Sequence, residues 1–287
     1  MVLYEWKTSG KYFSYDGHTI FYRDEGAGEV LLCIHGFPTA SWDWHRIWPG
    51  LTKRFRVIAL DMIGFGFSDK PRDYAYSIHD QATLHESLLQ TLGIQRVHIL
   101  AHDYGDTVAQ ELLARYEDRQ KDGVQGIEIS SVCFLNGGIF PEATHPRLIQ
   151  KLLISPLGPL AGRFVSEARF RKSFSAIFGQ NTQPCDRELS DFWSLITFHD
   201  GTKVIHKVIR YMDERKKYRA RWVGVLQRTK VPMRLIIGLV DPVSGADVVA
   251  RYREIVPNPD VVVLENIGHY PQLEDPDGVL RAFLDFV

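Results

Sequence analysis

The chain has 287 residues, of which 45% are hydrophobic, 12% aromatic and 24% charged, a composition that excludes a largely disordered protein. Its 34 basic and 35 acidic residues give a net charge of −1, so the chain as a whole has no attraction for nucleic acid or for an anionic membrane. Apolar runs stay well short of the roughly 18 residues that a membrane span needs. We therefore expect neither nucleic acid nor a membrane as a partner.

Strand and helix patterns alternate along the first half of the chain. Two alternating segments around the turn signal Asp16-Gly17 predict a hairpin, and short apolar runs predict further, fully covered strands. Strands are predicted at 11–15, 18–23, 30–34, 56–60, 97–101 and 129–135, and helices at 78–92 and 106–116. This alternation is typical of an α/β fold with a mostly parallel sheet.

The pattern changes between about residues 140 and 225, where helical stretches replace strands. Helices are predicted there at 147–153, 166–178, 188–197 and 202–218, followed by strands at 235–238 and 261–264 and a closing helix at 279–287. We therefore predict a core segment at 1–139, a helical cap at 140–226 and a second core segment at 227–287. The basic run at 215–221 is interpreted as a solvated helix face.

The segment Ala101 to Gly105 follows a predicted strand, precedes a helix and has the frame of a nucleophile elbow with Asp103 at its centre. A carboxylate attacks an sp3 carbon that carries a leaving group and forms an ester. A lone Asp here would indicate a helix N-cap, but the strand and helix around it favour a nucleophile. Asp106 is interpreted as a negative charge favoured by the helix N-terminus.

Two further segments follow predicted strands, and ligands of open α/β sheets bind at those strand ends. His269 would deprotonate water, and Asp241 would orient its imidazole, in the order nucleophile, acid, base. The acid could instead follow the predicted strand that ends at Leu135, but the residue there is Asn136, which has no carboxylate. Asp241 is therefore the better candidate. The backbone N–H groups of Phe37 and Tyr104 can form an oxyanion hole, although a simple turn also explains Phe37.

No cofactor or metal is expected. The segment Gly64 to Asp69 lacks the third glycine of a dinucleotide fingerprint, and the eleven histidines lack metal-ligand spacing. Three widely spaced cysteines do not indicate disulfides, and Met1 to Lys7 does not resemble the start of a signal peptide. We expect a cytoplasmic protein, and the sequence carries no signal for a particular oligomeric state.

The segments His35–Pro38, Asp61–Pro71 and His102–Gly105 resemble the α/β-hydrolase superfamily, in its branch of epoxide hydrolases and haloalkane dehalogenases. The resemblance implies an eight-stranded, mostly parallel sheet flanked by helices, with a helical cap inserted after the sixth strand. Epoxide hydrolases usually have two cap tyrosines that donate protons to the epoxide oxygen. Tyr211 lies about where the second is expected, and His145 is the candidate for the missing first. Helix packing for Tyr211 and a loop position for His145 remain alternatives.

Haloalkane dehalogenases usually have Trp after the nucleophile, and many have Asn after the His-Gly pair, whereas this chain has Tyr104 and Phe37 there. Trp193 and Trp222, in the predicted cap, are candidate substrate-binding donors in their place. The function we expect is hydrolysis of a small, largely apolar epoxide or similar electrophile, with water as the second substrate. Haloalkane dehalogenation is the first alternative, and a non-catalytic ligand- or partner-binding protein is the second.

Overall fold

The computed structural model describes residues 1–163 and 165–287, and within them eight strands form one sheet in the order β1-β2-β4-β3-β5-β6-β7-β8. β1 and β2 pair antiparallel, as do β2 and β4, and every later pair is parallel. The predicted eight-stranded, mostly parallel sheet is confirmed. The strands are β1 (Lys11–Tyr15), β2 (His18–Glu25), β3 (Val30–Ile34), β4 (Arg56–Leu60), β5 (Arg96–His102), β6 (Glu128–Leu135), β7 (Met233–Gly238) and β8 (Asp260–Leu264).

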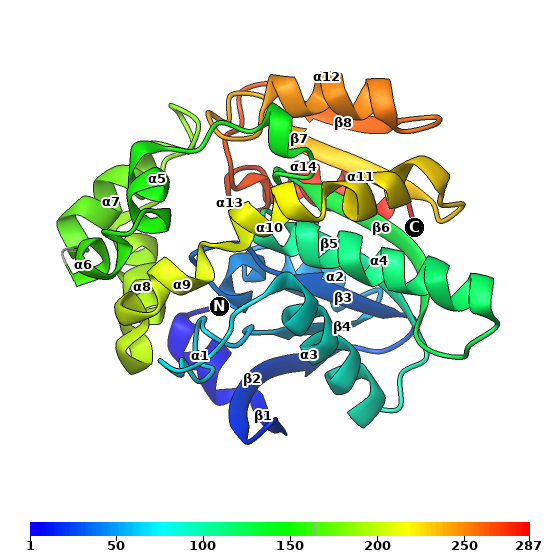
Figure 1. Cartoon of the computed structure of the whole chain (residues 1–287), viewed down its shortest axis with the longest axis horizontal. Helices are drawn as coiled ribbons and strands as arrows, with labels where there is room; N and C mark the ends of the chain where they lie inside the picture. The colour runs from blue at the N-terminus through cyan, green and yellow to red at the C-terminus, as the bar shows by residue number, and fades with distance from the viewer. Residues whose placement is uncertain (164) are drawn as a thin grey trace.

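Helices cover both faces of the sheet (Figure 1), because alternate side chains of each strand point to opposite sides. Leu32 and Ile34 of β3 pack on one side, and Leu31 and Cys33 pack on the other. The first side is covered by α3 (Ile78–Thr91), α4 (Tyr104–Asp122), α11 (Arg219–Arg228) and α12 (Ala246–Ile255). The second is covered by α1 (Leu3–Thr8), η1 (Ser41–Trp44), α2 (Trp48–Leu51) and α14 (Pro276–Leu284). Burial on both faces explains why these strands are continuous apolar runs.

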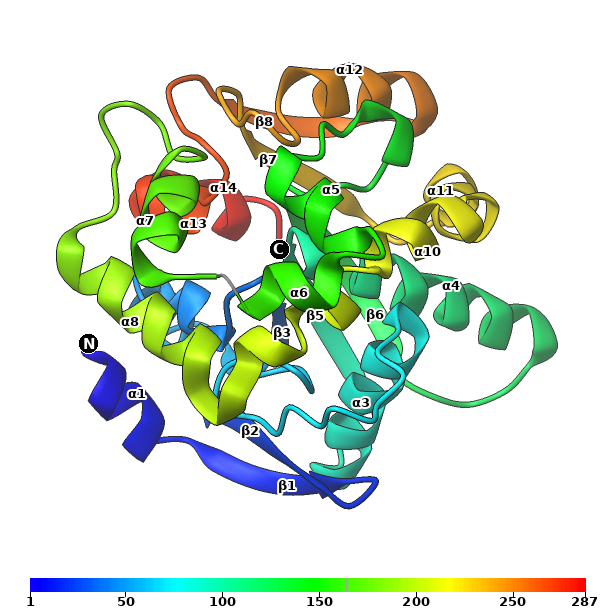
Figure 2. The same cartoon turned by 60° about the vertical axis from the view of Figure 1, so that its left-hand side comes forward.

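A helical segment joins β6 to β7, and most of it forms a group beyond one end of the sheet (Figures 1 and 2). It contains η2 (Pro141–Ala143), α5 (Leu148–Ile154), α6 (Gly158–Arg163), α7 (Glu167–Ser175), α8 (Asp186–Thr197), η3 (Phe198–Lys203), α9 (Ile205–Val208) and α10 (Tyr211–Lys217). The next helix, α11, packs along α4 beside the sheet, although it falls within the predicted cap range.

The predicted continuous helix at 202–218 is wrong. The chain forms the end of η3, then α9 and α10 instead, because turns at Val204 and at residues 209–210 separate these short elements. The positive φ values of His199 and Asp200, 49° and 62°, lie before this range, within η3. The breaks turn successive short helices toward different neighbours. The helix α12, between β7 and β8, was not predicted, because ten residues give too short an apolar pattern to stand out between two strands.

A buried carboxylate fixes α11 on α4. Glu111 is 2% exposed and accepts hydrogen bonds from Trp222 Nε1 at 2.8 Å, Arg221 Nε at 2.7 Å and Arg115 Nε at 2.9 Å. Burial opposes the charge, but these donors outweigh it and lower the pKa of Glu111 to about 2. The charge is therefore kept in the interior because several donors satisfy it.

We expect Glu111→Gln to lower the free energy of unfolding by about 3 kcal/mol, because it leaves Arg221 and Arg115 without their buried carboxylate. Asp118→Asn is the matched control, since it removes an exposed partner of the same Arg221 at 2.7 Å and should cost less than about 0.5 kcal/mol. Urea unfolding at pH 7 measures both. Equal losses would show that Glu111 does not fix α11.

Candidate active site

Asp103 lies at the sharp turn between β5 and α4, with φ 48° and ψ −104°. A positive φ is strained for a residue with a side chain, and such strain persists only where neighbours enforce it. The side chain makes no capping hydrogen bond to α4, so the N-cap alternative does not describe it. Instead, Oδ2 accepts the backbone N–H of Phe37 at 3.0 Å. The turn thus holds the carboxylate against the loop after β3, as the nucleophile-elbow pattern requires.

The structure brings His269 and Asp241 together beside Asp103. Asp241 Oδ2 lies 2.7 Å from His269 Nδ1 and also accepts hydrogen bonds from Ser244 Oγ at 2.6 Å and Asn136 Nδ2 at 3.0 Å. Burial disfavours the imidazolium, but Asp241 and the nearby charge of Asp103 raise the pKa of His269 to about 9. At neutral pH, His269 is therefore a cation next to two carboxylates. Sequence reasoning missed the supporting roles of Ser244 and Asn136.

The loop that carries His269 is fixed through its main chain. Glu274 Oε2 accepts the N–H groups of Gly268 at 2.9 Å and Gly179 at 2.7 Å, and its Oε1 accepts that of Tyr270 at 3.0 Å. Glu274 ends α13 (Pro271–Glu274), directly after this loop. The backbone N–H of His269 donates to the main-chain oxygen of Ile177, which lies just after α7. The imidazole is consequently held in place by bonds on both sides of it.

Of the predicted oxyanion-hole residues, Phe37 directs its N–H at Asp103, and Tyr104 is the first residue of α4. The ring of Tyr104 points into the core, where its centre lies 5.4 Å from that of Phe65 and 4.6 Å from that of Tyr211. Tyr211 is buried beside Phe37, with ring centres 5.9 Å apart. Burial and the charge of Asp103 raise the pKa of the Tyr211 phenol, which stays protonated at neutral pH.

Three predicted cap residues are not brought to this site. His145 is largely exposed, and its Nε2 lies 2.6 Å from Asp247 Oδ2 on α12. The indole N–H of Trp222 is committed to Glu111, on the side of α4. Trp193 packs behind Phe170, with ring centres 5.7 Å apart, and is not among the residues that line the cavity described below. The ring nitrogen of His145 and the indole N–H of Trp222, which were expected to contact a substrate, are thus paired with carboxylates of the protein itself.

A cavity of about 560 Å³ opens above Asp103 and His269, between the sheet and the helical segment. Its walls are mainly apolar, with a few polar groups. The apolar lining is Phe37, Pro38, Ile149, Leu152, Leu153, Val165, Phe170, Phe174, Ile177, Ile205 and Val243, and the remaining polar lining is Arg147, Gln150, Arg169 and Ser173. Such a space fits a small, largely apolar molecule that is held against the carboxylate.

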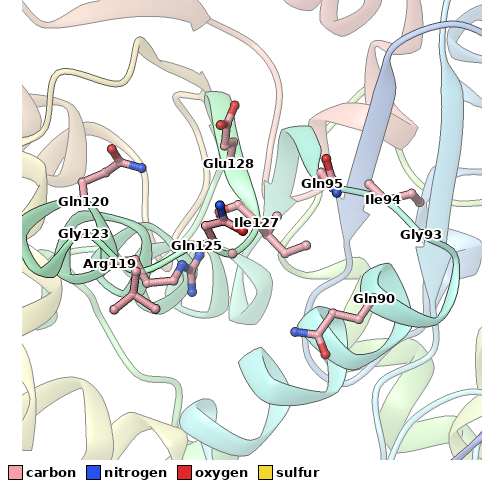
Figure 3. A pocket seen from close by; sticks show the side chains of 12 residues that line it. Gln90, Gly93, Ile94, Gln95, Arg119, Gln120, Gly123, Gln125, Ile127 and Glu128 are labelled. Atoms are coloured by element: carbon pink, nitrogen blue, oxygen red, sulfur yellow. Dashed lines mark hydrogen bonds between the residues drawn. The ribbon is translucent and has the colours of Figure 1, made fainter.

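A larger cavity, of about 860 Å³, lies near the amino ends of β5 and β6 (Figure 3). Glutamine side chains and glycine-rich turns surround it, and Arg119 there donates to Glu86 and to the carbonyl of Ile127. Size alone therefore does not identify the functional site. Within residues 1–163 and 165–287, no group of three or more His, Cys, Asp or Glu side chains is arranged to hold a metal ion.

Arg215, on α10, was missed as a site residue, and the prediction of a solvated face at 215–221 is wrong for it. Its side chain is 7% exposed. Nη2 donates to the main-chain oxygen of Asp103 at 2.8 Å and lies 3.7 Å from its Oδ1, and Nε donates to Thr107 Oγ1 at 2.7 Å. The i, i+4 spacing from Tyr211 was the available signal, because it places both residues on one helix face.

Asp106 also differs from expectation. It lies in the first turn of α4, as expected, but is fully buried. Burial and the charge of Asp103 raise its pKa well above the usual value, although Arg215 acts in the opposite direction. The carboxyl group is thus favoured in its neutral form, which leaves the positive charge of Arg215 available to Asp103.

Known proteins are similar in sequence to this chain over nearly its whole length. A family model described as the alpha/beta hydrolase fold matches residues 29–276. The mesoderm-specific transcript protein of Mus musculus is 47% identical over 296 residues, which cover 99% of this chain and 88% of that protein. LipZ of Mycobacterium tuberculosis, which is named as a hydrolase, is 36% identical over 99% of this chain and 97% of its own.

Solved structures share the fold at low sequence identity. The haloalkane dehalogenase DatA from Agrobacterium tumefaciens C58 has a TM-score of 0.78 at 21% identity and covers 96% of this chain and 94% of its own. The epoxide hydrolase CorEH has a TM-score of 0.79 at 18% identity and covers 96% and 97%. The matched family model and the extent of the relatives show that the chain belongs to the α/β-hydrolase fold family.

Proposed function

We propose that the protein hydrolyses a small, largely apolar epoxide or similar electrophile through an ester on Asp103. The observation that carries this proposal is the geometry of Asp103. It sits in a strained turn at the floor of an apolar cavity, one carboxylate oxygen accepts the Phe37 N–H, and the His269–Asp241 pair lies beside it. A carboxylate in this position attacks carbon, and its held oxygen becomes the oxyanion when the ester is hydrolysed.

In the first step, Asp103 forms a C–O bond to an epoxide carbon, and the ring C–O bond breaks. The epoxide oxygen takes the proton of Tyr211, which supports this role by being buried, protonated and close to Asp103. Ester formation removes the negative charge of Asp103. Because that charge helps to raise the pKa of His269, His269 then gives its proton to the Tyr211 phenolate through solvent.

In the second step, neutral His269 takes a proton from water, and the hydroxide attacks the ester carbonyl carbon. The N–H of Phe37 stabilises the oxyanion, together with that of Tyr104. The ester C–O bond then breaks, the diol leaves, and His269 and Asp103 return to their charged forms. Asp241 stabilises the imidazolium throughout, and helices α5 to α10 act as the cap that limits access of water.

Haloalkane dehalogenation uses the same ester, but a halide needs N–H donors in the cavity. The indole N–H of Trp222 is committed to Glu111 and Trp193 packs on Phe170, whereas Tyr211 is near enough to Asp103 for that charge to raise the pKa of its phenol, so epoxide opening is the better-supported reaction. The complete set of Asp103, Asp241 and His269, with its supporting hydrogen bonds, argues against a non-catalytic binding protein. Water and a small molecule are thus the proposed substrates, and we place the protein in the cytoplasm.

The ester itself is the first test. We expect His269→Gln to accumulate an adduct when it is incubated with a panel of epoxides and haloalkanes, because the step that needs the base is blocked. Intact-protein mass spectrometry would show a gain of one whole epoxide for ring opening, or of an alkyl group for dehalogenation. Asp103→Asn should form no adduct and lose about 10⁴-fold in kcat. Adducts of equal yield on both variants would contradict the assignment of Asp103.

Arg215 should position Asp103 for attack. We expect Arg215→Met to slow ester formation by about 10- to 100-fold, because the main chain and Oδ1 of Asp103 lose their cation and a small displacement of a reacting group has an effect of this size. Single-turnover mass spectrometry measures the rate. Lys216→Met is the control, since Lys216 is exposed on the same helix. An unchanged rate in a folded Arg215→Met protein would remove Arg215 from the mechanism.

The His269–Asp241 pair should also appear in stability. The pKa of His269 is raised from 6.5 to about 9, so its stabilisation is full below pH 6.5 and is lost as the pH rises through 9. We expect the free energy of unfolding of the wild type to fall between these values by on the order of 3 kcal/mol more than that of His269→Gln. Urea unfolding over this pH range measures the difference. Parallel profiles would show that the charged pair is absent.

A further inference from the structure

Exposed apolar side chains gather on α5, on α6 and on the turn between them. Among the described residues, five of the ten exposed large apolar side chains fall within residues 148–160. They are Leu148 (83% exposed), Leu157 (60%), Leu160 (52%), Leu152 (43%) and Ile149 (41%). α5 and α6 pack against each other, so these side chains belong to one surface, which we call the apolar patch. Large apolar surface of this kind marks an interaction site.

The apolar patch is continuous with the cavity above Asp103. Ile149 and Leu152 are both exposed and both line that cavity, and Leu153, which also lines it, is buried. Apolar side chains therefore extend from the outside of α5 to the interior of the site. In Figure 2, α5 and α6 lie in front of the sheet. Whatever covers the patch also covers the approach to the site.

The charge of this segment differs from that of the whole chain. Residues 145–172 contain six Lys or Arg and one Glu, a net charge of +5 in a protein whose total is −1. Lys151 is exposed on α5 between Leu148 and Leu152. The one acid of the segment, Glu167, is paired with Arg171 at 2.8 Å. The segment of sequence that carries the patch is therefore strongly positive, which favours an anionic occupant.

We propose that the apolar patch docks on an anionic lipid surface and directs the mouth of the cavity toward it. Apolar side chains flanked by basic ones bind at the boundary between headgroups and acyl chains, and each Lys or Arg near an anionic surface adds about 1 kcal/mol. A second copy of the chain is disfavoured, because a twofold contact would place the positive segment against itself. The contact is peripheral, since across the described parts of the chain no helix has the length and apolarity to cross a bilayer.

Docking would bring an apolar substrate to the site from the phase in which it is concentrated. The inference goes beyond the proposed reaction and does not depend on it, because lipid binding needs neither Asp103 nor a substrate. It differs from the expectation that the protein has no membrane partner. That expectation used the net charge of the whole chain, which does not describe a local surface.

The test is flotation of the purified full-length chain with vesicles of phosphatidylcholine alone or with added phosphatidylglycerol. We expect binding to the anionic vesicles that weakens at high salt. The triple variant with Leu148→Ser, Leu157→Ser and Leu160→Ser should reduce this binding by tenfold or more, because it removes three apolar side chains that would insert into the vesicle surface. Val124→Ser is the matched control, because Val124 is 57% exposed near the other cavity. Asp103→Asn should bind like the wild type.

Lys151→Glu is a second variant for the case in which the triple variant is misfolded by circular dichroism. It should weaken binding to anionic vesicles and leave any binding to neutral vesicles unchanged. The proposal is overturned if the wild type floats with neither vesicle, or if the folded variants bind as the wild type does. A wild-type dimer in analytical ultracentrifugation that the triple variant converts to a monomer would assign the apolar patch to a second copy instead.

Discussion

The turn at Asp103 is the constraint on which the geometry of the candidate active site depends. A residue with φ 48° between β5 and α4 places its carboxylate at the end of a central strand, and the neighbouring backbone has to come very close. A Cβ at Gly105 would lie 2.3 Å from the carbonyl oxygen of Ile34, and one at Gly36 would lie 3.1 Å from Cβ of Asp103. Glycine at both positions lets the loop after β3 present the N–H of Phe37 to the carboxylate.

The charges around this turn are arranged so that Asp103 and His269 can change charge in succession. Arg215 approaches from α10, His269 lies beside the carboxylate with Asp241 behind it, and Asp106 is favoured as a neutral acid. Two cations therefore lie near the negative charge of a single carboxylate. In the proposed reaction, ester formation would remove that charge, and with it one cause of the raised pKa of His269, which could then act as a base. The proposed order of proton transfers thus follows from the order of charge changes at Asp103.

The helical segment between β6 and β7 is broken into short helices, and these helices reach different parts of the candidate site. Turns at Val204 and at residues 209–210 divide its second half into short helices. As a result, Ile205 lines the cavity, while Tyr211 and Arg215 reach the turn at Asp103. The earlier helices, α5 and α6, expose apolar side chains next to the mouth of the same cavity. The side chains nearest Asp103 and the exposed apolar side chains thus come from opposite ends of one insertion.

The sequence by itself determined the sheet and the placement of Asp103, Asp241 and His269 at its active edge. Apolar strands carry a period-two or continuous signal, and the carboxyl ends of parallel strands meet at one edge, so residues far apart in the chain could be assigned to one place. Tertiary structure decided which other side chains join them. The basic run containing Arg215 has the pattern of a solvated face, and only the break before α10 turns that residue inward.

For the same reason, His145 and Trp222 could be placed in the helical segment but not on its inner side. Each had a nearer partner, Asp247 or Glu111, that no local pattern shows. The apolar patch is a further case, because hydrophobic periodicity predicts that α5 has a face to cover but not whether the protein covers it. Local sequence encodes what a strand or helix can bury. The contacts between separate elements decide what it does bury, and these depend on loop geometry and on the competition among partners across the whole fold.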